Sequence, residues 1–249
     1  MSLLALVALA LTGCAADGTA DSGATADTGD DTALPWSTEV DIVLDWTEGE
    51  DLEAPIELDD GGSVVLAEGW AMTWSVELQP CSAYEDAVTI GHAATTESEA
   101  RTVKAPVVHD LTDTTQVYMG HAHPMPGEYC GAWPLLSWTN EATPALYVPD
   151  GGEVLIDEAL SVSLSAERTT SSGKTTPIVA TAQTARGGQL AFDDDVVLDL
   201  EDGDEGWVVT VRRDRAAALA ATDWEADDVG AALQDALLDT TYVELTRRD

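Results

Sequence analysis

The chain has 249 residues, 45% of them hydrophobic, and a formal net charge of −37 at pH 7, because 47 acidic residues face only 10 basic ones. The hydrophobic content is typical of a globular protein with a core, so a wholly disordered chain is excluded. The acidic surface repels nucleic acid phosphates and anionic lipid headgroups, which argues against both as partners of that surface. The same surface attracts cations.

An apolar run followed by a cysteine opens the sequence. Residues 2–11 are nearly all Leu, Ala and Val, about the length of the apolar region of a signal peptide and too short to span a bilayer. Residues 11–14 (Leu-Thr-Gly-Cys) resemble the lipobox of bacterial lipoproteins. This resemblance, which extends no further than Cys14, implies that residues 1–13 are a signal peptide and that Cys14 is acylated. Acyl chains would then anchor the protein to the cell membrane or outer membrane, outside the cytoplasm.

The residues after this cysteine have the composition of a tether. Residues 15–33 contain no large apolar side chain and consist mainly of Ala, Asp, Gly, Ser and Thr. Such a segment cannot bury enough apolar surface to offset the entropy lost on ordering. We therefore expect residues 14–35 to be an acylated cysteine followed by a flexible, self-repelling linker.

Alternation of apolar and polar residues dominates the sequence from Thr38 onward, as is typical of half-buried strands. Residues 40–46 follow this pattern, and the turn sequence Asp-Asp-Gly-Gly at residues 59–62 predicts a hairpin. The longest predicted strand places one set of alternating side chains on a single face: Trp70, Met72, Trp74, Val76 and Leu78. These patterns predict a mainly β fold, an antiparallel β-sandwich.

Two parts of the sequence resemble each other. The matched segments are residues 60–75 with 150–165, residues 107–111 with 196–200, and residues 117–119 with 207–209. The similarity predicts two tandem or intertwined β units, at 36–126 and 127–249. A single β-sandwich domain over residues 36–249 remains an open alternative.

Helical patterns are confined to the C-terminal part. Asp214 is placed to cap a helix over residues 215–221, and Asp227 or Asp228 to open another over residues 229–238. Both predicted helices are short.

Cys81 and Cys130 remain as a pair when Cys14 is acylated. An even number of cysteines in an exported protein predicts a disulfide.

The scarce metal-binding side chains gather in residues 117–130, which include two of the four histidines. A strand over residues 117–123 would project Val117, Met119, His121 and His123 from one face. The internal similarity aligns Met119 with Val209, His121 with Val211 and His109 with Leu198, so we expect these side chains to point inward. Buried histidines need partners for their ring nitrogens, either hydrogen bonds or a metal.

The sequence therefore suggests a metal site built from His109, His121, His123 and Met119, with Met125 or His92 as further ligands. Imidazole with thioether suits copper, and imidazole with carboxylate suits zinc. The alternative is that His121 and His123 lie at a strand end, one bonded to a carbonyl group and the other in water.

No phosphate-binding loop, dinucleotide fingerprint, nucleophile elbow or His-Glu-x-x-His motif occurs in the sequence. We therefore expect a binding protein and not an enzyme. Two hypotheses stay open: a lipoprotein with a β-sandwich module that binds copper or zinc, and a structural or adhesive module of the cell envelope in which the histidines are incidental.

Overall fold

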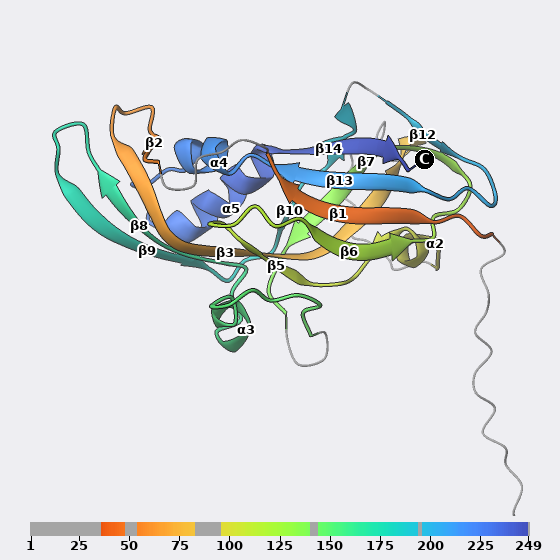
Figure 1. Cartoon of the computed structure of the whole chain (residues 1–249), viewed down its shortest axis with the longest axis horizontal. Helices are drawn as coiled ribbons and strands as arrows, with labels where there is room; N and C mark the ends of the chain where they lie inside the picture. The colour runs from red at the N-terminus through yellow and green to blue at the C-terminus, as the bar shows by residue number, and fades with distance from the viewer. Residues whose placement is uncertain (1–35, 48–53, 83–95, 140–143, 194–195, 249) are drawn as a thin grey trace, which may run out of the picture. The chain divides into compact units, whose positions relative to one another are not determined.

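The computed structural model describes residues 36–47, 54–82, 96–139, 144–193 and 196–248 (Figure 1). The predictions for the signal peptide, Cys14, the linker and His92 lie outside these residues. Within the described part of the chain, no helix has the length and apolarity needed to cross a membrane.

The strands form two sheets. The smaller sheet has the order β14-β13-β1-β6. Its strands are β1 (Val40–Trp46), β6 (Val117–Ala122), β13 (Trp207–Arg213) and β14 (Thr241–Arg247). The pair β1–β13 is parallel and the other two pairs are antiparallel.

The larger sheet is antiparallel and has the order β10-β7-β3-β8-β9. Its main strands are β3 (Ser63–Pro80), β7 (Gly127–Leu136), β8 (Val162–Thr169), β9 (Thr175–Ala182) and β10 (Arg186–Gly187). Short strands pair with β3 or β7 beside this path: β2 (Ile56–Glu57), β4 (Thr102–Val103), β5 (Val107–Asp110), β11 (Leu190–Ala191) and β12 (Leu198–Leu200).

The two sheets pack face to face over part of their area. One apolar cluster contains Ile42 of β1 and Val209 of β13 together with Leu78 of β3 and Ala132 of β7. Side chains from both sheets therefore share one core, as in a β-sandwich. The predicted mainly β fold with short C-terminal helices is confirmed, with one parallel strand pair in the smaller sheet.

Helices cover the rest of the larger sheet. Of the two longer ones, α5 (Val229–Asp239) packs on β8 and β9, and α4 (Arg215–Ala221) packs on α5 and β2 (Figure 1). They share a second apolar cluster that includes Leu164, Leu219 and Leu237. Two shorter helices are α2 (Thr96–Ala100) and α3 (Val154–Asp157), and α3 packs on Met72 and Val108.

Strand β3 spans 18 residues and takes part in all three apolar clusters. A register shift between Thr73 and Ser75 interrupts its pairing with β7. Met72 consequently packs toward α3, whereas Val76 and Leu78 pack between the sheets. The prediction that Met72, Val76 and Leu78 share one face is therefore wrong, because a register shift reverses the alternation of side chains.

The described residues belong to one compact unit. Its smaller sheet combines β1 and β6, from residues 36–126, with β13 and β14, from residues 127–249. Both of the internally similar segments therefore contribute strands to the smaller sheet.

The predicted disulfide between Cys81 and Cys130 is present, with the two Cα atoms 4.8 Å apart. It follows from the ladder between β3 and β7, in which Pro80 lies opposite Tyr129 and so brings the neighbouring cysteines together. Such bonds form and persist in oxidising compartments, which is consistent with a place outside the cytoplasm.

Candidate metal site

The site is built on an irregularity in β6. The ladder between β1 and β6 pairs Ile42 with Gly120 but Val43 with Tyr118, so β6 has one extra residue at this point. Gly120 has a backbone φ of +135°, which favours glycine. Such a bulge changes the face on which the following side chains lie.

The bulge turns His121 outward. Val117 and Met119 are buried between the sheets, whereas Tyr118 and His121 are exposed. The prediction that Val117, Met119, His121 and His123 project from one face is wrong, and so is the inward position expected for His121. A strict period of two does not allow for the extra residue at Gly120.

His121 and His123 meet Glu39 on the outer face of the smaller sheet. The register sets Asp41 opposite His121, and continuing it by two positions sets Glu39 opposite His123. One ligand-type atom from each of Glu39, His121 and His123 lies within 4.8 Å of the others. Among the described residues, this is the only such group of three His, Cys, Asp or Glu side chains.

Backbone contacts fix the chain on both sides of the group. The Trp36 indole donates to the His123 carbonyl oxygen at 2.8 Å, and the Thr38 hydroxyl donates to the carbonyl oxygen of Pro124. The His123 amide donates to the carbonyl oxygen of Ala100 at 2.7 Å. The segment before β1 is therefore tied to the segment after β6, which holds Glu39 beside His123.

Each histidine ring has one nitrogen in a hydrogen bond. Nδ1 of His123 lies 3.0 Å from the carbonyl oxygen of Thr38, and because a carbonyl group only accepts, this nitrogen carries the proton. Nδ1 of His121 lies 3.3 Å from the Tyr118 hydroxyl. The two rings stand edge to face with their centroids 4.9 Å apart.

Tyr118 links His121 to a buried acid. Its hydroxyl donates to Asp41 Oδ1 at 2.9 Å, so the phenol oxygen can accept from Nδ1 of His121. Asp41 in turn pairs with Arg248 at 2.5 Å. Partial burial, followed by the hydrogen bond to Asp41 and the charges of Asp41 and Glu39, raises the pKa of Tyr118 to about 12. Tyr118 therefore keeps its proton at neutral pH.

The structure does not bring His109 or Met119 to this group. Met119 is 1% exposed and lies in the core between the sheets. His109 packs on Trp46, with ring centroids 5.2 Å apart, and Trp46 is five positions along β1 from Asp41. That separation is about 17 Å along a strand. Met125 is exposed, in the loop between β6 and β7.

The sequence interpretation missed Glu39. Its local signal was weak, because Glu39 is one of 47 acidic residues. Only the pairing of β1 with β6, which lie more than 70 residues apart, brings it to the histidines.

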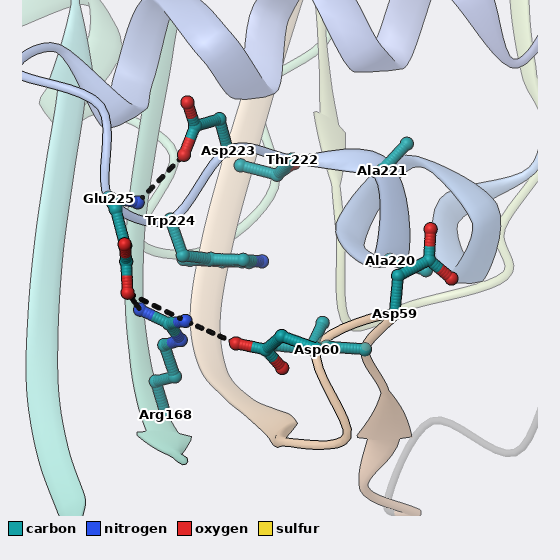
Figure 2. A pocket seen from close by; sticks show the side chains of 10 residues that line it. Asp59, Asp60, Arg168, Ala220, Ala221, Thr222, Asp223, Trp224 and Glu225 are labelled. Carbon is teal, nitrogen blue, oxygen red and sulfur yellow. Dashed lines mark hydrogen bonds and ion pairs between the residues drawn. The ribbon is translucent and has the colours of Figure 1, made fainter. Parts of the chain in front are cut away.

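A separate pocket of about 330 Å³ lies where β8, the turn before β3 and the α4–α5 connection meet (Figure 2). Figure 2 shows Arg168 between Asp60 and Glu225, at 2.6 Å and 3.4 Å from their carboxylate oxygens. The amide of Gly62 and then Arg168 lower the pKa of Asp60. The guanidinium group is thus already neutralised, and the pocket walls carry further carboxylates from Asp59 and Asp223.

A second pocket, of about 730 Å³, lies on the larger sheet beside α3. Trp70 lines it together with Glu68, Asp150 and Val179. Gly151, at a φ of +85°, packs against the Trp70 ring, where a Cβ atom would lie 2.7 Å from ring carbon Cζ2. The pocket combines an aromatic side with acidic groups and has no histidine in its lining.

No protein family model matches this chain, and no curated protein and no solved structure matches it either. Its function is therefore inferred from the chemistry and arrangement of its own side chains.

Proposed function

We propose that this protein is a bacterial lipoprotein whose β-sandwich domain binds zinc through Glu39, His121 and His123 outside the cytoplasm. The observation that carries the proposal is the convergence of three ligand-type atoms within 4.8 Å on the outer face of the smaller sheet. It keeps two ligands expected from the sequence and replaces His109 and Met119 by Glu39.

The ligand set favours zinc over copper. Two imidazoles with one carboxylate are a common zinc set, whereas copper would gain from the thioether of Met119, which lies in the core. Ligand atoms about 2.1 Å from a tetrahedral ion are roughly 3.4 Å from one another. Small side-chain rotations would close the gap from 4.8 Å.

The hydrogen bonds of the two rings prepare them for a metal. With Nδ1 of His123 bonded to the Thr38 carbonyl and Nδ1 of His121 to Tyr118, Nε2 of each neutral ring keeps its lone pair. Partners of this kind orient metal-binding histidines and raise their basicity.

Solvent access favours exchange of the ion. Three protein ligands leave a fourth position for water or for a ligand from another molecule. The net charge of −37 raises the local concentration of cations at low salt. We infer that the site stores, delivers or senses zinc.

Membrane anchoring is the second part of the proposal, and the resemblance of residues 11–14 to a lipobox supports it. The disulfide between Cys81 and Cys130 agrees with export. Anchoring predicts that a Cys14→Ala variant leaves the membrane fraction and no longer incorporates labelled fatty acid. If the Cys14→Ala variant stays in the membrane fraction to the same extent as wild type, and wild type incorporates no labelled fatty acid, lipid anchoring through Cys14 is contradicted.

Elemental analysis after loading with zinc acetate and dialysis tests the metal site. We expect about one zinc ion per wild-type chain, and loss of the zinc in the His121→Ala/His123→Ala variant. Glu39→Gln should weaken binding, while the matched variant Glu128→Gln, at an exposed position of β7, should not.

His109→Leu distinguishes the ligand set expected from the sequence, which includes His109, from the set of Glu39, His121 and His123. Because His109 lies outside the group, this variant should retain zinc as long as it folds. Absence of retained zinc in the wild-type protein would overturn the proposal and leave the structural or adhesive module as the function to test.

A further inference from the structure

Arg213 is a buried cation that has no acidic partner among the residues the structure describes. It is the last residue of β13 and is 0% exposed. Its Nη2 atom donates to Thr73 Oγ1 at 2.7 Å, but Nε and Nη1 have no hydrogen-bond partner. No carboxylate in the described part of the chain forms an ion pair with it. Burial lowers the pKa of Arg213 to about 10, so it remains charged at neutral pH.

His109 is a second buried group without polar partners. It is 1% exposed, and neither Nδ1 nor Nε2 forms a hydrogen bond with any described residue. Burial, and then the nearby charge of Arg213, lower the pKa of His109 well below 6.5. The ring is therefore neutral and carries one N–H donor and one acceptor nitrogen.

The strand register places these groups together between the sheets. The β3–β5 ladder pairs Ala71 with His109 and Thr73 with Val107, so His109 and Thr73 are diagonal neighbours on one face. Arg213 reaches Thr73 from the opposite sheet, where its register partner is Trp46. The surroundings belong to the apolar cluster that contains Trp46, Ala71, Leu111 and Leu136.

This arrangement has many donors and few acceptors. Nε and Nη1 of Arg213 and one nitrogen of His109 are unpaired donors, and the Thr73 hydroxyl, whose oxygen accepts from Arg213, can also donate its proton. A water molecule would need acceptors for its two hydrogens, and among the unpaired side-chain nitrogens of Arg213 and His109 only one, on His109, can accept. An anion accepts from every donor and also neutralises the charge.

We propose that Arg213, Thr73 and His109 hold a small inorganic anion of the halide class, such as chloride, between the two sheets. Because Arg213, Thr73 and His109 are all buried, the ligand must be a small ion. The proposal is independent of the zinc site, which lies toward the other end of β1 on its outer face. The net charge of −37 opposes anion entry at low salt, so occupancy should rise as salt screens the surface.

Bromide is the direct probe, because it replaces chloride and scatters X-rays anomalously. Crystals of the protein soaked in sodium bromide should show an anomalous peak within hydrogen-bond distance of Arg213 and His109. Water density at this position, or no density, would overturn the proposal.

Stability measurements test the same site in solution. At constant ionic strength, replacing gluconate by chloride should raise the folded-to-unfolded ratio of the wild-type protein, by about 100-fold when chloride reaches 100 times its dissociation constant. Arg213→Met should remove this response, and Arg213→Lys should reduce it. Arg247→Met, which removes an exposed charge from β14, is the matched control and should keep it. An equal chloride response in Arg213→Met and wild type, or no response in wild type, would refute anion binding.

Discussion

Asp41 and His121 lie directly opposite each other on β1 and β6, and the Tyr118 hydroxyl connects them. This link orients the His121 ring and fixes the proton on its Nδ1 atom. In metal sites, such partners of the ligands contribute substantially to affinity although they do not touch the ion.

Tyr118→Phe should therefore weaken zinc binding by about 10- to 100-fold, the usual effect of losing an outer partner of a ligand. The fold should be kept, because the Tyr118 side chain is 47% exposed. Competition with a chromophoric zinc chelator would measure the affinity. Tyr147→Phe, at a 37% exposed tyrosine outside the group, is the control, and equal affinities for the two variants would contradict the role of Tyr118.

Gly120→Ala should disturb both stability and the metal site. A Cβ atom at Gly120 meets only Val103 Cγ1, at 3.4 Å, so the cost arises from the φ of +135°. Strain of this kind is of the order of 1–3 kcal/mol, and relief of the bulge would move His121 from the outer face. Urea unfolding and chelator competition would measure the two effects.

Gly173→Ala provides the comparison for this variant. Gly173 also has a positive φ, of +81°, in the turn between β8 and β9, and its added Cβ would meet no atom within 4 Å. The Gly173→Ala variant should be less stable than wild type but should bind zinc with the same affinity. If Gly120→Ala behaves in the same way, the bulge does not position His121.

Local signals in the sequence predicted several elements correctly. Asp214 and Asp228 each accept a hydrogen bond from the backbone amide three residues later, as expected of residues that cap helices. The disulfide was predictable because the three cysteines allow only one pairing once Cys14 is set aside. These features depend on residues close in sequence or on simple counting.

The candidate site depended on two features that local patterns do not contain. The bulge at Gly120 moved His121 to the outer face, and the pairing of β1 with β6 supplied Glu39. A glycine in a strand can mark a bulge, but nothing in the sequence says which neighbouring side chains it redirects. The ligand set could therefore be predicted only in part.

Loss of the disulfide should destabilise the fold. The bond joins residues 49 positions apart, and on the chain-entropy model closing such a loop stabilises the protein by about 4 kcal/mol. The Cys81→Ser/Cys130→Ser variant should lose this amount in urea unfolding and should not respond to reductant. A reductant-sensitive variant, or wild type that is equally stable when reduced, would contradict the prediction.

Acid should destabilise the protein through His109. Burial and then Arg213 hold the pKa of His109 well below 6.5, so as pH falls below about 6.5 the unfolded chain takes up a proton that the folded chain does not. Stability should therefore fall with decreasing pH in this window, by up to about 1.4 kcal/mol per pH unit. Among the described residues, the charged groups recorded near the ring are Arg213 and, across Trp46, Arg215, whose guanidinium lies 5.7 Å from the Trp46 ring.

His109→Leu should remove this part of the pH dependence while keeping an apolar contact with Trp46. The free energy of unfolding would be measured from pH 7.5 to 5.5 in gluconate, because a bound halide would oppose the pKa shift. His121→Ala, which removes an exposed imidazole from the outer face, is the matched control. If wild type and His109→Leu show the same slope, the stability loss in acid arises from other groups, and burial of a neutral His109 does not contribute to it.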